Sequence, residues 1–152
     1  MVSEDVYMDT IASIIKFLQE EVENIRADGV SDNIEFKNLD GHAEDQVLEN
    51  IDYLLFRNFC GNIGDHFCDY TFEIGVSTFE DENLLRHMDI MNRMVKLLSP
   101  LKQIKVYSYK DYWLQRGVLT CAEPTTLQPF SKYNTRAIQF LLVSVESTET
   151  MP

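Results

Sequence analysis

The segment from Asp69 to Phe79 constrains the fold most, because polar and apolar side chains alternate along it. Its apolar residues occupy every second position: Tyr70, Phe72, Ile74 and Val76. Successive side chains of a β-strand point to opposite faces of a sheet, so this pattern predicts a strand with one buried face. With the apolar segment that precedes it, residues 51–59, we expect it to form a hairpin or a meander.

The N-terminal residues 3–26 have the spacing of an amphipathic helix. Ser3 is a good N-cap, and Gly29 is placed to take the left-handed conformation past the helix end. Apolar residues recur at helical spacing in between: Ile11, Ile14, Ile15, Leu18, Val22 and Ile25.

A second helix is predicted at residues 80–98, directly after the central strand. Thr78 and Asp81 resemble a capping box, and the acidic residues 80–82 oppose the positive end of the helix dipole. The pair Ser99-Pro100 ends the helix, because a residue before proline disfavours helical backbone.

The remaining segments predict further strands and one long loop. Residues 34–39, 104–113 and 137–145 read as strands, whereas residues 122–133 contain two prolines and read as a loop. The order of elements predicts an α+β fold: a mostly antiparallel β-sheet of four to five strands, with two main helices packed on one face.

A chain of 152 residues fits a single domain, residues 1–152, with a frayed C-terminal tail from about residue 147. Its three cysteines are an odd number, and its acidic N-terminus lacks the basic start of a secretory signal. We therefore expect reduced thiols and a protein of the cytoplasm, or of a particle assembled there.

The formal net charge of −12 limits the possible partners. A strongly negative field repels nucleic-acid phosphates and anionic membrane surfaces. The chain also has no apolar run long enough to span a bilayer. Sequence-specific nucleic-acid binding and membrane binding are both disfavoured.

No residue pattern points clearly to chemistry. Cys60, His66 and Cys68 come closest to a metal site, but packed cysteines beside a loop histidine explain them better. No recognisable motif surrounds a cysteine nucleophile, and no phosphate-loop, serine-hydrolase or zinc-protease motif occurs. We expect no catalytic, metal or cofactor-binding site and a protein that is not an enzyme; a thiol enzyme using Cys60 or Cys68 stays the alternative.

Aromatic side chains concentrate in one short segment. The residues are Tyr107, Tyr109, Tyr112 and Trp113, and Arg116 follows them. Aromatic and arginine side chains are enriched at the energetic centres of protein interfaces. This segment is therefore the candidate partner interface, with burial in the core as the competing explanation for about half of its members.

Three segments together give the chain a family resemblance: Asp69-Tyr-Thr-Phe-Glu-Ile-Gly-Val-Ser-Thr78 leading into the helix of residues 80–98, Ile104-Lys-Val-Tyr-Ser-Tyr109, and Gln139-Phe-Leu-Leu-Val-Ser-Val145. In their order and size, the chain resembles the tail terminator (tail completion) proteins of long-tailed bacteriophages over most of its length. The long loop from Glu123 to Tyr133 departs from the short members of that family. The family has no strict motif, so no residue roles are transferred.

The resemblance implies a six-membered ring that caps the tail tube, stops its polymerisation and joins it to the head connector. Its partners would be further copies of itself, the tail tube protein and the connector, with the tail sheath as a further candidate. The protein would reside in the virion after assembly in the host cytoplasm. Six chains of −12 each carry −72, and any acidic residues that face the lumen would repel DNA and let it slide through the ring.

Two other classes of function remain open. One is a different neck or tail part, such as a connector or tube initiator. The other is an acidic DNA-mimicking inhibitor or immunity-type protein that neutralises a basic partner. That function predicts a monomer and a tight, salt-sensitive complex.

Overall fold

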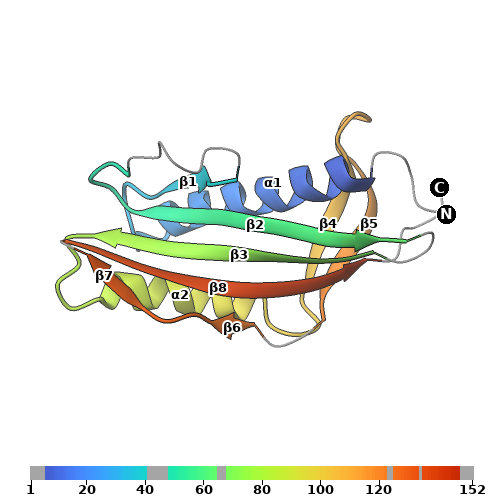
Figure 1. Cartoon of the computed structure of the whole chain (residues 1–152). Helices are drawn as coiled ribbons and strands as arrows, with labels where there is room; N and C mark the ends of the chain where they lie inside the picture. The colour runs from blue at the N-terminus through green and yellow to red at the C-terminus, as the bar shows by residue number, and fades with distance from the viewer. Residues whose placement is uncertain (1–5, 41–47, 65–67, 123–124, 134, 148–152) are drawn as a thin grey trace.

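A computed structural model describes residues 6–40, 48–64, 68–122, 125–133 and 135–147. These residues form two helices and eight strands (Figure 1). In chain order the elements are α1 (Val6–Ala27), β1 (Glu35–Asn38), β2 (Tyr53–Ile63), β3 (Cys68–Phe79), α2 (Leu85–Leu97), β4 (Gln103–Ser108), β5 (Leu114–Cys121), β6 (Thr126–Leu127), β7 (Ser131–Tyr133) and β8 (Arg136–Ser147).

The strands form one mixed sheet in the order β1-β2-β3-β8-β5-β4, and β6 and β7 also pair with β8. β3 lies in its middle and pairs antiparallel with β2 and with β8, whereas β1 and β2 are parallel. The prediction of a mostly antiparallel sheet of four to five strands is therefore wrong. The predicted pairing of β2 with β3 is confirmed.

The missing strands all come from the C-terminal half of the chain. Residues 104–113 were expected to be one strand, but β4 ends at Ser108 and the chain turns back into β5. The predicted loop of residues 122–133 contains the short strands β6 and β7. They pair with the same edge of β8 as β5 does, along the part of that edge that β5 leaves unpaired. Backbone pairing with the long β8 makes these strands, although their side chains show little alternation.

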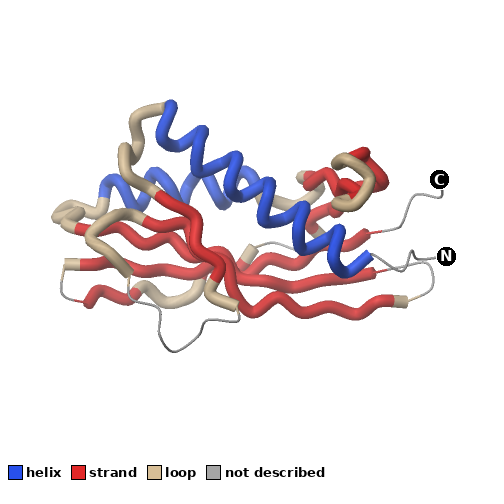
Figure 2. The backbone as a smooth tube through the Cα atoms, turned by 90° about the horizontal axis from the view of Figure 1, so that it is seen from above, coloured by secondary structure: helices blue, strands red, loops and turns tan. Residues whose placement is uncertain are grey.

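Both helices pack on the same face of the sheet. Alternate residues of β3 face them and are fully buried, and they join residues of both helices in one core cluster that includes Ile14, Leu18, Ile90 and Met94. Figure 2 shows α1 lying diagonally across the strands. The N-terminal half of α1 contacts β4, and its C-terminal end reaches the residues at the start of β1. No helix of the described residues is long and apolar enough to cross a membrane.

The other face of the sheet carries no helix, so side chains of the sheet cover its apolar centre. The Phe140 ring lies over Gly75, where an added Cβ would come within 2.6 Å of a ring carbon. The Arg57 guanidinium stacks on that ring, 3.4 Å from its centroid, and bonds to Glu73 at 3.1 Å. This stack keeps Leu55 buried without a covering helix.

The helix predicted at residues 80–98 begins five residues later. β3 continues to Phe79, opposite Arg136, and the Glu80 N–H donates to the Thr135 carbonyl. The capping box does not form; the Asp81 carboxylate instead accepts from the N–H of His87, in the first turn of α2, at 2.8 Å. The predicted N-cap of α1, Ser3, lies outside the described residues, as does the tail beyond residue 147.

A buried carboxylate joins the start of β2 to the elements around it. Asp52 is 2% exposed and accepts hydrogen bonds from Ser31 Oγ at 2.6 Å, from the Phe79 N–H at 2.9 Å and from Arg86 Nε at 2.7 Å. Burial opposes its ionisation, but these donors outweigh burial and lower the pKa of Asp52. The carboxylate therefore ties the start of β2 to the end of β3, to α2 and to the turn before β1.

Candidate interaction surface

The aromatic segment spans the end of β4, the start of β5 and the turn that connects them (Figure 1). We call residues 107–116 the aromatic hairpin. The N–H groups of Asp111 and Trp113 both donate to the Ser108 carbonyl, and Ser108 Oγ donates to the Asp111 carboxylate at 3.1 Å. These bonds close a tight turn at its tip.

Two buried polar residues of α1 hold the aromatic hairpin in place. Ser13 Oγ accepts from the Tyr107 N–H at 2.9 Å, and Asp9 accepts from the Tyr109 N–H at 3.0 Å. The other oxygen of Asp9 forms an ion pair with Arg116. Since Asp9 and Ser13 are one helical turn apart on α1, they reach two N–H groups two residues apart, one at the end of β4 and one just after it.

Aromatic rings pack against one another beneath the tip. Trp113 is at the centre, with its ring centroid 6.4 Å from that of Tyr107 and 5.3 Å from that of Tyr109, both edge-to-face. The Lys16 ammonium lies 5.1 Å from the Tyr107 centroid and 5.8 Å from the Trp113 centroid. Aromatic pairs and cation–π contacts of this kind stiffen the hairpin against α1.

The tip itself faces solvent. Tyr112 is 94% exposed, Leu114 66% and Tyr109 51%. Tyr112 and Trp113 both have left-handed backbone, with φ of 57° and 59°. That conformation is uncommon for non-glycine residues and unfavourable for bulky ones, so the surrounding structure must enforce it.

The structure brings the five predicted interface residues together and divides them into two roles. Tyr107, Trp113 and Arg116 mainly anchor the aromatic hairpin, whereas Tyr109 and Tyr112 are displayed. Whether a partner binds them stays a prediction. Sequence reasoning missed Leu114 at the tip and the anchors on α1. The available signal was a pair of polar residues, Asp9 and Ser13, among the core-facing positions of the first helix.

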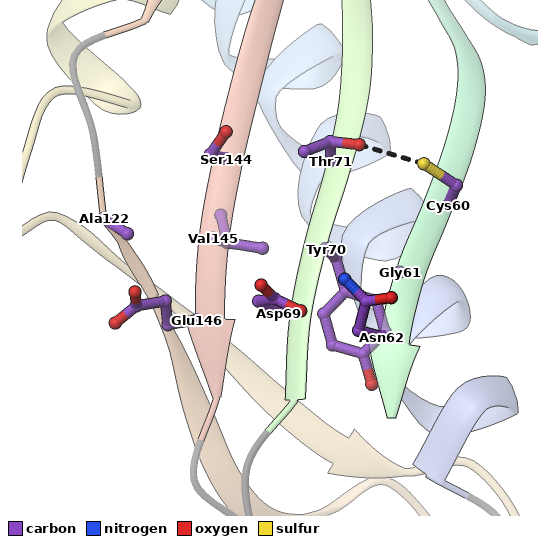
Figure 3. Close-up of a pocket in the computed structure, with 10 residues that line it drawn as sticks. All are labelled: Cys60, Gly61, Asn62, Asp69, Tyr70, Thr71, Ala122, Ser144, Val145 and Glu146. Carbon is purple, nitrogen blue, oxygen red and sulfur yellow. Dashed lines mark hydrogen bonds between the residues drawn. The ribbon is translucent and has the colours of Figure 1, made fainter. Parts of the chain in front are cut away.

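A hollow of about 490 Å³ lies on the uncovered face of the sheet, apart from the aromatic hairpin (Figure 3). Asp69 and Glu146 are direct neighbours on β3 and β8, and Cys60 Sγ lies 3.0 Å from Thr71 Oγ1. The hollow is open and its lining is mixed in polarity; it presents acidic and hydroxyl groups without a convergent set of ligands.

The cysteines considered for a metal site are separated by the sheet. Cys60 pairs with Thr71 and is exposed on the uncovered face, whereas Cys68 is buried on the helix-covered face with the alternate residues of β3. Within the described ranges, no group of three histidine, cysteine or acidic residues could hold a metal ion. His42 and His66 lie outside those ranges. Burial raises the pKa of the Cys121 thiol, which makes it a poor nucleophile.

Comparison with known proteins gives a fold and no function. No protein-family model matches the chain. No curated protein sequence matches it either. A solved structure whose name describes no activity is similar, with a TM-score of 0.51 and 10% sequence identity, covering 100% of this chain and 99% of its own. Similarity at that identity shows that the fold of the whole chain occurs in another protein.

Proposed function

We propose that this chain is a structural assembly protein that binds further copies of itself into a ring, like a tail terminator that caps a tail tube and joins it to the head connector. The aromatic hairpin is the observation that carries the proposal. It combines exposed aromatic and aliphatic side chains with an anchored base, whereas the described hollows present no arrangement for chemistry.

An anchored aromatic tip suits protein binding on energetic grounds. Tyrosine provides a large contact area with few rotatable bonds, so little conformational entropy is lost when it is covered. The bonds from Asp9 and Ser13 hold the backbone of the hairpin before any partner arrives. Without a partner, Leu114 and Tyr112 expose apolar surface to water, which is unfavourable; a bound partner would cover that surface.

The test is the mass of the purified chain by light scattering over a concentration series, at low and moderate salt. We expect association that increases with concentration and with salt, because salt screens the repulsion between chains of −12. Electron microscopy of the associated fraction should show closed rings. A monomer at every concentration and salt would contradict the ring.

A double variant, Tyr112→Ser with Leu114→Ser, tests the role of the aromatic hairpin. It should remain monomeric under conditions in which the wild-type chain associates. Met88→Ser is the matched control, because Met88 is 53% exposed on α2, away from the hairpin. If the control weakens association as much as the double variant, the aromatic hairpin is not the contact.

A further inference from the structure

β4 is an edge strand whose free side is only partly closed. It pairs with β5 alone, and the Lys102 carbonyl, just before it, accepts from the N–H of Cys121 at the end of β5. The Tyr107 N–H points the other way, to α1. Because backbone groups alternate along a strand, the N–H and C=O groups of Gln103 and Lys105 also point outward.

α1 closes the tip end of this edge and leaves the other end open. The Ser13 hydroxyl accepts from the Tyr107 N–H, but no described residue accepts from the N–H of Gln103 or Lys105. A hollow of about 260 Å³ lies beside these two residues, and Phe17 of α1 is part of its lining. Free N–H and C=O groups on a sheet edge are a template for another strand.

The stretch of chain that contains this edge is basic, in a protein whose net charge is −12. From Lys96 to Lys110 the sequence has no acidic residue. Lys102 and Lys105 are exposed, and among the residues that the structure describes no acidic side chain pairs with either of them. Across the hollow, Lys16 and Glu20 of α1 pair with each other and add no net charge. The open edge therefore attracts an acidic strand.

The strand edges that a second copy could offer are not acidic. β1 carries Lys37 beside Glu35, and Arg26 bonds the Ile34 carbonyl just before it. β7 carries Lys132, and a second β4 would present the same lysines again. Since none of these edges has the required charge, the acidic strand belongs to a different protein.

The exposed backbone groups favour a polypeptide over a nucleic acid. Outward N–H and C=O groups alternate along β4, which is the pattern that another polypeptide backbone complements. Phosphate groups accept hydrogen bonds but cannot donate them to the free C=O groups. The net charge of −12 also repels a nucleic acid as it approaches.

We propose that the open edge of β4 at Gln103 and Lys105 binds an extended acidic segment of another protein, which adds to the sheet as a strand. The backbone of the segment pairs with the outward groups of these two residues, and its carboxylates pair with Lys102 and Lys105. This inference goes beyond the proposed self-assembly and does not depend on it, because the bound strand is not part of this chain.

Synthetic peptides test the proposal by nuclear magnetic resonance of the isotope-labelled chain. The probe is a short peptide of alternating glutamate and valine, because that alternation places all its carboxylates on one face of a strand. It should shift the amide resonances of Gln103 and Lys105 and slow their hydrogen exchange. The matched peptide of alternating lysine and valine should bind at least about tenfold more weakly. Equal binding of the two peptides, or unchanged resonances at both amides, would overturn the proposal.

Charge reversal on the protein tests the role of the lysines. The double variant Lys102→Glu with Lys105→Glu should bind the glutamate peptide at least about tenfold more weakly and should prefer the lysine peptide. Lys37→Glu with Lys132→Glu is the matched control, because it changes the net charge by the same amount on β1 and β7. The control should bind as the wild type does. An equal loss in both variants would show that net charge and not the β4 edge governs binding, and would reject the site.

Methylation of the peptide backbone tests strand addition without changing any charge. A glutamate–valine peptide with methylated backbone nitrogens keeps its carboxylates but cannot donate the hydrogen bonds of a strand pair. It should bind at least about tenfold more weakly than the unmodified peptide. Equal binding by the two peptides would exclude strand addition. A single-stranded DNA oligonucleotide that shifts the same amides more strongly than the peptide would assign the edge to nucleic acid and overturn the proposal.

The outcomes separate this inference from the proposed self-assembly. Peptide binding to a chain that stays monomeric would support the open edge as a site for another protein and contradict the ring. A ring that forms in the wild type, is lost when Lys102 and Lys105 are reversed, and is accompanied by no peptide binding would assign the edge to a second copy and overturn this inference.

Discussion

The two ends of the sheet, at β1 and at β4, are both closed by side chains of α1, but by different kinds. At β1, Arg26 Nε donates to the Ile34 carbonyl at 2.8 Å, and the arginine itself is exposed. At β4, Ser13 and Asp9 accept from two N–H groups, and both are fully buried. A long exposed side chain covers one edge loosely, and short buried ones fix the other.

A buried aspartate with an arginine partner is found on each side of this comparison. Asp52, beside β1, joins β2, β3 and α2 and touches no displayed surface. Asp9, beside β4, joins α1 to the aromatic hairpin. The same kind of buried aspartate–arginine pair therefore stabilises the fold at one end and holds the exposed aromatic hairpin in place at the other. We expect variants to separate the two roles.

Removing either carboxylate should have the largest effect. Asp52→Ala and Asp9→Ala should each lower the free energy of unfolding, measured in urea, by about 3 kcal/mol, because a buried ion pair is broken from one side. At urea concentrations at which both variants are folded, the Asp52→Ala chain should still associate, whereas the Asp9→Ala chain should not. The Asn variants are controls that keep shape. Equal loss of association at both positions would contradict the division of roles.

Acid should affect the β1 end through Asp52. Its pKa in the folded chain lies below the ordinary value of 3.8, so its stabilisation is present above that value and is lost as pH falls through the folded pKa. Urea midpoints of the wild type and of Asp52→Asn should differ at about pH 5 and converge in stronger acid. A difference that stays constant with pH would mean that the Asp52 charge does not stabilise this end.

An element could be predicted from the sequence when the pattern of its own side chains determines it, and could not when its pairing with other strands does. The strand around Phe72 and the helix around Leu18 were predicted because side-chain periodicity decides them. β5 was missed because the turn at Ser108, which separates it from β4, was taken as part of one continuous strand; its other partner, the end of β8, lies farther along the sequence. The parallel β1–β2 pair has no local signal either.

The aromatic segment was found from composition alone, but its division into anchor and tip was not. Tyr107 and Tyr112 are the same residue type five positions apart, and only the turn at Ser108 places one against α1 and the other in solvent. The buried Asp9 that fixes this arrangement lies a hundred positions away from Tyr109, so no local pattern connects them.

Removing the α1 side chain that bonds the backbone at each edge should lower the free energy of unfolding moderately, and by unequal amounts at the two edges. Ser13→Ala should cost about 1 kcal/mol, because the Tyr107 N–H loses its acceptor in a buried position. Arg26→Ala should cost less than half of that, since water can bond the Ile34 carbonyl. Hydrogen exchange at the Tyr107 amide should accelerate in the first variant and not in the second. Equal losses would mean that both edges are closed equally well.

The smallest effect should have the opposite sign. Tyr112 is almost fully exposed with φ of 57°, so Tyr112→Asn loses little packing and places a residue that tolerates left-handed backbone. We expect a gain of about 0.5 kcal/mol in the free energy of unfolding, together with weaker association. Glu80→Asn is the matched control: Glu80 is exposed with φ of 55° after β3, at the end of the sheet that Asp52 fixes. It should gain similar stability and associate normally. A Tyr112→Asn chain that is less stable would show that the tip holds the fold together; one that is more stable and associates less would show that strain at the tip is retained for binding.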